Sequence, residues 1–464
     1  MAKTQVSIDT NIYNIKAKDE SILKTYGLTE QVVREISKLK GEPDWILDIR
    51  LKGLKLFYEL ENPTWGPDLS MLHIEEIATY VKPNSNMERS WEDIPDEIKN
   101  TFDRLGIPEA EKKSLAGVGA QFDSEMVYHN LEEELKSKGV IYCNFDEAIF
   151  KYPELFKKYF MKAVPINDHK YIALHYALFS GGSFIYIPKG VKLDMPLQSY
   201  FRLNAPGAGQ FEHTLIIVED DASLEFIEGC SAPGYNDLNL HAGCVELFVG
   251  KNAYLRFSTI ENWSRNMLNL NTKKCIVDAH GKIEWITGSF GSKISMLYPL
   301  SILNGEGATC EYTGISFAGK GQNLDTGLKV VLNAPKTNLF VDSKSISKDG
   351  GICTFRSNVD VMKNAHKANL ALSCESLMLD SESKSDTIPF NDIRVDDITF
   401  SHEATIGKIS DEMIFYLMSR GLDEEEAKAL IVRGFAEPIS KSFPVEYAVE
   451  MNRLINLELE GTIG

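Results

Sequence analysis

The chain lacks the short cysteine spacings that bind metals or form redox pairs. Its 464 residues contain seven cysteines, no two of them in a C-x-x-C arrangement, and none precedes Cys143. An odd number of widely spaced cysteines argues against a disulfide framework and against a zinc knuckle. We therefore expect reduced thiols in a cytosolic compartment.

Long hydrophobic runs and an excess of positive charge are also missing. No apolar stretch approaches the roughly 20 residues that a membrane-spanning helix requires. The opening residues, MAKTQVSIDT, resemble neither a signal peptide nor a basic transit peptide. The formal net charge is −18, whereas nucleic-acid-binding proteins usually present a basic face. The sequence thus predicts a cytoplasmic protein with no membrane and no nucleic-acid partner.

The first part of the chain is expected to be helical. Apolar residues at helical spacing predict helices over residues 23–40 and 44–60, and short charged helices are expected over 93–105 and 126–138. We assign residues 1–165 to an N-terminal helical domain.

Helical spacing disappears after this region, and a turn followed by a short strand recurs at a nearly constant period. Aligning the units gives steps of 31, 28, 27, 29 and 31 along one series of positions: Leu224, Leu255, Ile283, Cys310, Leu339 and Leu370. A small unit repeated at this period indicates a solenoid, because one unit alone cannot bury its apolar face. We interpret residues 166–405 as a parallel β-helix core. A β-sandwich with coincidental spacing is the alternative.

Helical patterns return in residues 406–464, the predicted C-terminal helical domain. Ser410 can cap a helix that stops at Gly421, and Asp423 begins a second helix with a capping box. Gly434 is expected to end that second helix. We expect these helices to cover the open end of the solenoid, where a sheet edge would otherwise be exposed, and to offer a docking surface for a partner.

Cys374 and the adjacent residues His402 and Glu403 are candidate metal ligands. His402 follows Cys374 by one repeat period, so we expect these side chains on neighbouring rungs of the stack. A thiolate, an imidazole and a carboxylate suit iron or zinc. Adjacent residues of a strand point to opposite faces, so His402 and Glu403 reach the same metal only if the backbone bends.

Five segments of the chain resemble signatures of the SufB family of iron–sulfur cluster assembly proteins. They are GEPDWILDIRLK (41–52), GVGAQFDSEMVYHN (117–130), EGCSAP (228–233), SCESLM (373–378) and SHEATIGKISD (401–411). The resemblance runs from end to end in order. It implies a fold that is mainly β with helical ends, in which a right-handed parallel β-helix core lies between N- and C-terminal helical domains.

The resemblance also implies a non-enzymatic scaffold on which a transient iron–sulfur cluster is assembled. ATP turnover would belong to an ABC-type ATPase, SufC, docked on the C-terminal helices, since this chain has no G-x-x-x-x-G-K-[ST] loop. The second β-helix subunit would be SufD or another copy of this chain. Sulfur would come from a cysteine desulfurase through a SufE- or SufU-type carrier, and the involvement of a reduced flavin stays open. Some family members carry an N-terminal C-x-x-C cluster that this chain lacks.

Residue roles follow from the matched motifs. Cys374 would receive sulfur and bind the cluster, with Glu403 and His402 beside it; of the two, Glu403 has the stronger claim, and a subunit interface is the alternative role of His402. Cys230 would accept sulfur first. Polar residues would line an interior path between the two cysteines: Arg202, Asn204, Trp263 and Lys273. If basic, such a path would hold a persulfide anion and lower a thiol pKa, but Glu261 stands where the family often has glutamine, which adds negative charge.

Other positions and functions carry weaker signals. Cys310 is expected to pack in the core, and the Glu212–His213 pair has no ligand at a helpful spacing. A carbohydrate-active β-helix enzyme is a competing function, although no acidic pair recurs on successive rungs. A structural SufD-like role is another, although such chains generally lack the cysteine that matches Cys374.

Overall fold

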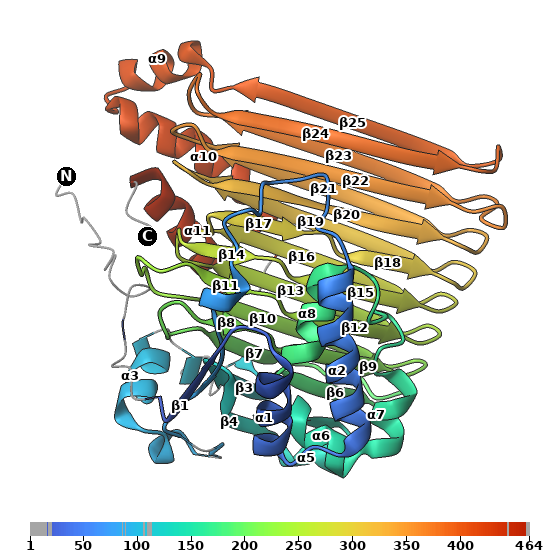
Figure 1. Cartoon of the computed structure of the whole chain (residues 1–464). Helices are drawn as coiled ribbons and strands as arrows, with labels where there is room; N and C mark the ends of the chain where they lie inside the picture. Colours follow the sequence, from blue (N-terminus) through green and yellow to red (C-terminus); the bar gives the residue numbers. More distant parts are fainter. Residues whose placement is uncertain are drawn as a thin grey trace.

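Parallel strands coil into a β-solenoid that forms the core of the chain in the computed structural model (Figure 1). The solenoid makes about eight turns between residues 184 and 408, with a mixed helical and strand region before it and helices after it. The structure describes residues 16, 21–85, 87–88, 90–104, 107–108, 114–442 and 445–460.

Two long sheets form the walls of the solenoid. The first contains the parallel strands β7 (Leu197–Arg202), β10 (Ser223–Ser231), β13 (Tyr254–Asn262), β16 (Lys282–Phe290), β19 (Thr309–Ala318), β21 (Asn338–Ser347), β23 (Asn369–Met378) and β25 (Thr399–Lys408). The second contains β6 (Ser183–Ile187), β9 (His213–Val218), β12 (Cys244–Val249), β15 (Thr272–Val277), β18 (Leu300–Leu303), β20 (Asn323–Leu332), β22 (Ile352–Val361) and β24 (Lys384–Ile393). A row of short strands joins the second sheet at β20: β8 (Gly209–Gln210), β11 (Asn239–His241), β14 (Met267–Asn269) and β17 (Ile294–Leu297).

The strand register confirms the repeat alignment made from the sequence. Leu224 pairs with Leu255, and each later member of that series pairs with the next, up to Leu339 with Leu370. Every step is parallel, as a coiled chain requires, so the sandwich alternative is wrong. The side chains of this series are buried and lie in one hydrophobic core that runs along the solenoid.

A left-handed backbone residue opens each repeat, three positions before the aligned core residue. These residues have φ between 53° and 69°: Asp221, Asn252, His280, Gly307, Lys336 and Lys367. Glycine, Asn, Asp and His tolerate this conformation best, so the first four positions carry the turn signal and the two lysines do not. Each backbone N–H donates to a carbonyl of the next rung, as Asp221 does to Lys251 at 2.8 Å. A hydrogen bond therefore links each turn to the turn of the next rung.

The N-terminal region mixes helices with strands rather than being all helical. Its helices are α1 (Glu30–Lys40), α2 (Asp44–Glu59), η2 (Ile74–Glu76), η3 (Trp91–Asp93), α3 (Asp96–Arg104), α5 (Glu133–Ser137), α6 (Phe145–Lys151), α7 (Pro153–Tyr159) and α8 (Lys170–Leu178). Its strands are β1 (Leu23–Tyr26), β2 (Ala78–Lys82), β3 (Gly117–Phe122), β4 (Glu125–Leu131) and β5 (Ile141–Asn144). The helix predicted over 126–138 is wrong in its first half, where β4 pairs antiparallel with β3. The strand β4 has only seven residues, and apolar and polar residues alternate over too few positions in it to distinguish a strand from the start of a helix.

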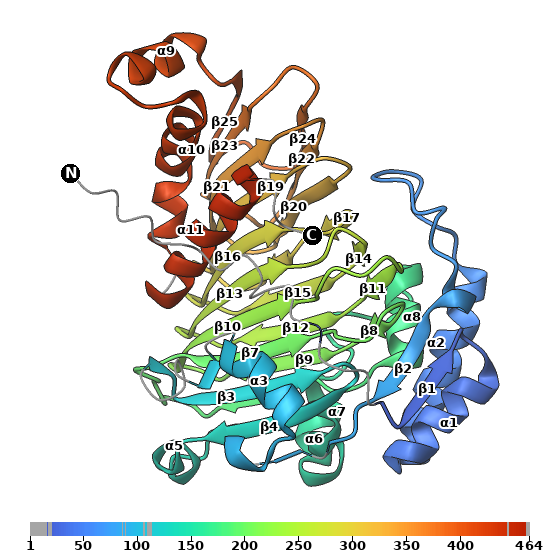
Figure 2. The same ribbon diagram turned by 90° about the vertical axis from the view of Figure 1, so that its left-hand side faces the viewer.

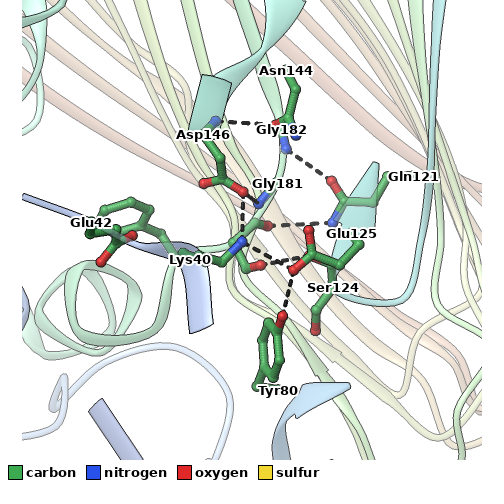
Figure 3. Close-up of polar contacts among 12 residues, drawn as sticks. Lys40, Glu42, Tyr80, Gln121, Ser124, Glu125, Asn144, Asp146, Gly181 and Gly182 are labelled. Carbon is green, nitrogen blue, oxygen red and sulfur yellow. Dashed lines mark hydrogen bonds and ion pairs between the residues drawn. The ribbon is translucent and has the colours of Figure 1, made fainter. Parts of the chain in front are cut away.

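Lys40 anchors helix α1 to the base of the solenoid (Figure 3). Its Nζ lies 2.6 Å from Oδ2 of Asp146 on α6 and 3.1 Å from Oε1 of Glu125 on β4. The same Asp146 oxygen accepts the backbone N–H of Gly181, and Tyr80 donates its hydroxyl to Glu125. Burial lowers the pKa of Lys40, but the neighbouring carboxylates raise it further, so its pKa lies above the ordinary value. The side chain therefore stays charged and links several elements.

The C-terminal helices pack on the flank of the solenoid and do not cover its end, which corrects the sequence-based expectation. Helices α9 (Asp411–Ser419), α10 (Glu424–Ser440) and α11 (Val445–Glu460) form a column beside the strands (Figure 2). Apolar residues of these helices pack against apolar residues of β13, β16, β19 and β21, mostly toward the C-terminal ends of those strands, and form one core with them. The caps at Ser410 and Asp423 are confirmed, but α10 continues through Gly434 and Pro438.

The last rung, β24 with β25, is consequently open. Each strand is the final member of its row in the described part of the chain, and both form the top of the stack in Figure 1. Apolar side chains are exposed on this rung: Ile388, Phe390, Ile393 and Ile406. None of the helices in the described ranges has the length and hydropathy required of a membrane-spanning segment.

Candidate functional site

Cys374 and His402 meet at the open end of the solenoid. Cys374 lies on β23 and His402 on the edge strand β25, where Cys374 pairs with Ala404 and Leu372 with His402. The side chains of Cys374 and His402 therefore lie on the same, inward face, one diagonal step apart. The Cys374 Sγ and His402 Nε2 atoms are 3.7 Å apart. A tetrahedral metal holds one sulfur and one nitrogen ligand roughly 3.6 Å apart, given bond lengths of about 2.3 and 2.1 Å.

Glu403 points to the other face of the same sheet. It pairs with Ser373, whose side chain also faces outward, and it lines a groove of about 380 Å³ on the outer surface. Asp342 and Glu311 line the same groove, and burial raises the pKa of the Asp342 carboxyl. The structure thus brings two of the three expected ligands together and separates the third by the thickness of the sheet. The backbone bend that would unite His402 with Glu403 does not occur.

Protonation at the pair follows from burial. The Cys374 side chain is 3% exposed, and burial with the nearby Asp342 carboxylate raises its thiol pKa to about 12. Burial lowers the pKa of His402, so at neutral pH its imidazole is uncharged. A neutral Nε2 next to a protonated thiol can accept the thiol proton. Cys374 is consequently inert as a thiol. It becomes nucleophilic as His402 accepts its proton during attack, and it becomes a ligand when a bound metal displaces that proton.

Two rows of inward residues, polar except for Gly314, run side by side from the rung of Cys230 to the rung of Cys374. Strand pairing places six residues in line, one on each rung: Cys230, Glu261, Ser289, Ser316, Ser345 and Ser376. A second row, two residues earlier on each strand, begins at Glu228 and ends at Cys374: Glu228, Thr259, Thr287, Gly314, Ser343 and Cys374. Both rows cross the same five strand spacings, roughly 24 Å.

Hydrogen bonds connect parts of these rows. Ser289 donates to Oε2 of Glu261 at 3.2 Å, and the hydroxyl oxygens of Ser345 and Ser376 are 2.7 Å apart. Sequence reasoning missed the rows, although the signal was there. They occupy fixed offsets of four and six residues after the aligned core series that starts at Leu224, so laying the repeats over one another reveals them.

Carboxylates outnumber basic groups around Cys230, in line with the negative charge that Glu261 was expected to add. Lys273 is buried and pairs with Glu228, Nζ to Oε1 at 2.5 Å. Burial raises the pKa of the Cys230 thiol well above its ordinary value, and Glu228 and Glu261 raise it further, whereas Lys273 opposes them. As Lys273 pairs with Glu228, His241 pairs with Glu212, Nε2 to Oε1 at 2.5 Å. Burial and the nearby acids together keep the thiol of Cys230 protonated.

Trp263 packs in the same buried cluster as Cys230, and Arg202 contacts Ser231, the residue after Cys230. Cys230 and Trp263 share one small apolar cluster, and the Trp263 ring lies 4.6 Å from the ring of His241. Arg202 is buried on the outward face of β7 and donates to Oγ of Ser231 at 3.0 Å, next to Cys230 in the chain. The backbone N–H of Asn204 donates to Asp123. Of the four predicted path residues, Trp263 and Lys273 thus lie beside Cys230, and Arg202 lies on the outward face of β7.

The remaining cysteines are buried. Cys310 is in the main core and donates toward Ser301. Cys353 lies beside the serine row, where Ser316 contacts its sulfur at 3.8 Å. Burial raises the thiol pKa of each of these two cysteines to about 12.

Comparison with known proteins agrees with this architecture. The family model described as the SUF system FeS cluster assembly SufBD core domain matches residues 201–435, and the SufBD protein N-terminal region matches residues 74–199. The chain is 52% identical over 465 residues, the full length of both chains, to an iron–sulfur cluster assembly SufBD family protein of Staphylococcus haemolyticus. A relative of the same description from Staphylococcus aureus is also 52% identical over the full length of both chains.

A long β-solenoid with helical flanks and a thiol–imidazole pair at its open end defines the class of protein. The chain belongs to the SufBD family of SUF-system iron–sulfur cluster assembly proteins. This membership gives it a role in iron–sulfur cluster assembly, and the competing interpretation as a polysaccharide-active enzyme does not agree with it.

Proposed function

We propose that this chain is the SufB-type member of the family, the scaffold on which the cluster is built. The observation that carries the proposal is the 3.7 Å contact between Sγ of Cys374 and Nε2 of His402 on the open rung. A soft thiolate and a borderline imidazole are a suitable pair for iron in the presence of sulfide. A purely structural, SufD-like chain would have no use for such a pair.

Sulfur reaches Cys374 by persulfide exchange. His402 accepts the thiol proton, and the Cys374 thiolate attacks the terminal sulfur of a donor persulfide. The donor S–S bond breaks, a new S–S bond forms on Cys374, and the donor leaves as a thiolate that takes up a proton. The donor would be a cysteine desulfurase acting through a SufE- or SufU-type carrier. Reducing the persulfide to sulfide takes two electrons from outside the chain, and a reduced flavin is the reductant to test first.

Cys230 is the proposed first acceptor on an interior route, and it would take sulfur from the carrier by the same exchange. About 24 Å separate it from Cys374, so on this route two electrons from outside the chain would reduce the Cys230 persulfide to the thiol and hydrosulfide. The hydrosulfide would then move along the two polar rows to iron held at Cys374 and form no persulfide there.

The hydroxyl groups of the two polar rows can hydrogen-bond a small sulfur anion without introducing fixed charge. Oε2 of Glu228, Oε1 of Glu261 and Nε1 of Trp263 are buried without a protein hydrogen-bond partner among the described residues. Buried polar atoms of this kind are normally satisfied by water or a passing ligand, which supports a wet interior path. Lys273 and Trp263 would act at its start, with Arg202 and Asn204 supporting that wall.

Glu403 is the proposed entry ligand for iron. As a hard carboxylate it suits ferrous iron before sulfide arrives, and its groove on the outer face also offers Asp342. Cys374 and His402 then hold the growing cluster on the inner face.

This division of roles predicts unequal effects of two substitutions. His402→Ala should lower the iron retained after anaerobic reconstitution and desalting roughly tenfold, the scale at which even indirect partners of a metal act. Glu403→Gln should slow iron loading and leave the final iron content close to that of the unmodified chain. Iron and acid-labile sulfide per chain, followed with time, distinguish the two. A low final iron content in Glu403→Gln alone would show that the carboxylate, and not the imidazole, is the lasting ligand.

Two exposed apolar surfaces are the proposed partner sites. Helix α9 exposes Met413, Phe415, Tyr416 and Met418, and it is the surface on which we place the SufC ATPase. The open rung, with Phe390 exposed on β24, is where we place a second β-helix subunit, either SufD or another copy of this chain. Clustered apolar groups and unpaired strand edges are the usual marks of interaction sites.

A native mass measurement of the complex purified with its ATPase tests the second surface. We expect two β-helix chains per complex, and Phe390→Asp should reduce this to one, because a carboxylate at the junction is desolvated without a partner. Phe340→Asp is the matched control, since Phe340 is also an exposed aromatic residue but lies on the outer face of β21, away from the edge. A complex that keeps both chains in Phe390→Asp would remove the open rung as the junction.

A further inference from the structure

Two histidines and a cysteine from different elements converge at the base of the solenoid, far along the stack from Cys374. His175 lies on helix α8, His213 on β9 and Cys244 on β12, where Cys244 pairs directly with His213. Their potential ligand atoms all lie within 4.8 Å of one another, and all three side chains are buried. No sequence motif marks the group, because its members are widely separated along the chain and come from a helix and two strands.

Each imidazole is oriented by a second partner. Nδ1 of His175 is 2.9 Å from the carbonyl oxygen of Ala242, which can only accept, so this nitrogen carries the proton and Nε2 keeps its lone pair. Nε2 of His175 lies 3.0 Å from Nδ1 of His213, and Nε2 of His213 lies 3.3 Å from Oε2 of Glu246. A carbonyl behind one histidine is a support that metal-binding histidines have in proteins. The carboxylate of Glu246 lies close to Nε2 of His213 without forming a hydrogen bond to it, and this buried nitrogen has no other hydrogen-bond partner among the described residues, so it is available to donate to Glu246 when Nδ1 binds a metal.

Glu246 is held rigidly in this supporting position. Its Oε1 accepts the backbone N–H groups of Ala163 and Val164 at 2.8 and 2.9 Å, and its Oε2 accepts that of Met161 at 2.7 Å. Phe145 stacks on the ring of His213 with centroids 4.4 Å apart. The His213 ring is therefore fixed between an aromatic face and a carboxylate.

The protonation states favour a cation. Burial lowers the pKa of both histidines, to about 3 for His213, so both rings are uncharged at neutral pH. Without a metal, Nδ1 of His213 donates its proton to Nε2 of His175, and metal binding would move that proton to Nε2 of His213, on the side of Glu246. Burial raises the pKa of the Cys244 thiol, and a bound metal would displace its proton. Burial raises the pKa of Glu246 to about 7, and a divalent ion beside it would favour its ionised form. The Cys244 thiolate and the Glu246 carboxylate would then supply two negative charges next to the ion.

We propose that His175, His213 and Cys244 bind one zinc ion through Nε2, Nδ1 and Sγ, with Glu246 as the supporting carboxylate of His213. Imidazole nitrogen and thiolate sulfur are the ligands zinc prefers, and a water completes the tetrahedron. Two nitrogen ligands of a tetrahedral zinc stand roughly 3.4 Å apart, so the histidines need to separate by a few tenths of an ångström from their present contact. The ion would join α8 to the second sheet and strengthen the base of the solenoid, separately from cluster assembly at Cys374.

Metal analysis of the full-length chain tests this site. All variants are built on the Cys374→Ala chain, called the parent. Metal bound at Cys374 on the open rung then does not add to the measured metal per chain. We expect about one zinc per parent chain after expression with zinc and dialysis against a chelator, and a loss of most of it in Cys374→Ala/Cys244→Ala. Cys374→Ala/Cys275→Ala is the matched control, because Cys275 is also a buried cysteine of the second sheet but packs in the main core. Equal zinc in the Cys244 and Cys275 variants, or none in the parent, would overturn the proposal.

Cobalt gives a second measurement that does not depend on the Cys244 variant folding. The parent, expressed with Co²⁺ in place of zinc, should show thiolate-to-cobalt charge-transfer absorption and intense visible bands of tetrahedral cobalt. Glu246→Gln in the same parent should retain the spectrum but lose metal to a competing chelator roughly 10- to 100-fold more readily. A parent without the thiolate band contradicts the site. A Glu246→Gln variant that releases cobalt at the parental rate contradicts the assignment of Glu246 as the supporting group.

Discussion

Cys374→Ala should remove most of the cluster that the chain can assemble. After anaerobic reconstitution with iron and sulfide, we expect visible absorbance, iron and acid-labile sulfide per chain all to fall at least about tenfold, since the lost thiolate is both the soft ligand and the sulfur acceptor. His402 alone would remain on the inner face, and one imidazole does not hold a cluster against desalting. Absorbance spectra and iron and sulfide assays measure the effect.

Cys310→Ala is the control for this experiment. Cys310 is an inward cysteine of the same sheet, two strands from Cys374, and it packs in the main core. Its replacement removes a buried sulfur of the same size but no proposed ligand, so cluster content should stay close to that of the unmodified chain. If Cys374→Ala retained the same iron content and spectrum, Cys374 would no longer be a candidate ligand, and the proposed scaffold chemistry would need another site.

Lys40→Met should produce the largest loss of stability among the substitutions considered. The side chains of Lys40, Asp146 and Glu125 are mostly buried, and methionine fills the volume of the lysine without its charge. Two carboxylates then remain at the base of the solenoid without their cation. Removing one partner of a buried ion pair typically costs about 3–5 kcal/mol, and we expect a value near the lower end because Glu125 is partly exposed. Urea unfolding monitored by circular dichroism measures it.

Lys136→Met provides the comparison. Lys136 pairs with Glu133 one turn away on the surface, with both side chains largely exposed. Such pairs contribute about 0–1 kcal/mol, so this variant should unfold close to the unmodified chain. Equal urea midpoints for the two variants would mean that the Lys40 cluster contributes no more than a surface pair, and that α1 is held to the solenoid by its apolar face alone.

The solenoid could be predicted because its signal is local and repeated. Each unit carries a left-handed turn residue followed three positions later by a buried core residue, and parallel stacking preserves that offset from rung to rung. The helix caps at Ser410 and Asp423 were predictable for the same reason, since a cap depends on neighbours within one turn. The end of α10 could not be predicted in this way. The helix continues past Gly434 because residues after it, such as Ala436 and Ile439, pack in the core.

The positions of the candidate ligands were only half predictable. Period and strand alternation indicated that Cys374 would lie beside one of the pair His402 and Glu403, on the next rung. They did not indicate which of the two it would be. The length of the repeat varies from rung to rung, so the sequence does not mark the register of β25 on β23. The register pairs Cys374 with Ala404, two positions beyond His402. That even offset keeps His402 on the inward face and sends Glu403 outward.

The coil of the chain and the alternation of buried and exposed residues within each rung are encoded locally, since both depend on backbone and side-chain preferences over a few neighbouring residues. What the rungs bring together emerges only in the folded molecule: the aligned hydroxyl rows, the acids around Cys230, and the meeting of His175, His213 and Cys244. These arrangements depend on register between strands and on the placement of helix α8 against them. Register is set by the packing of the whole stack, which no short segment encodes.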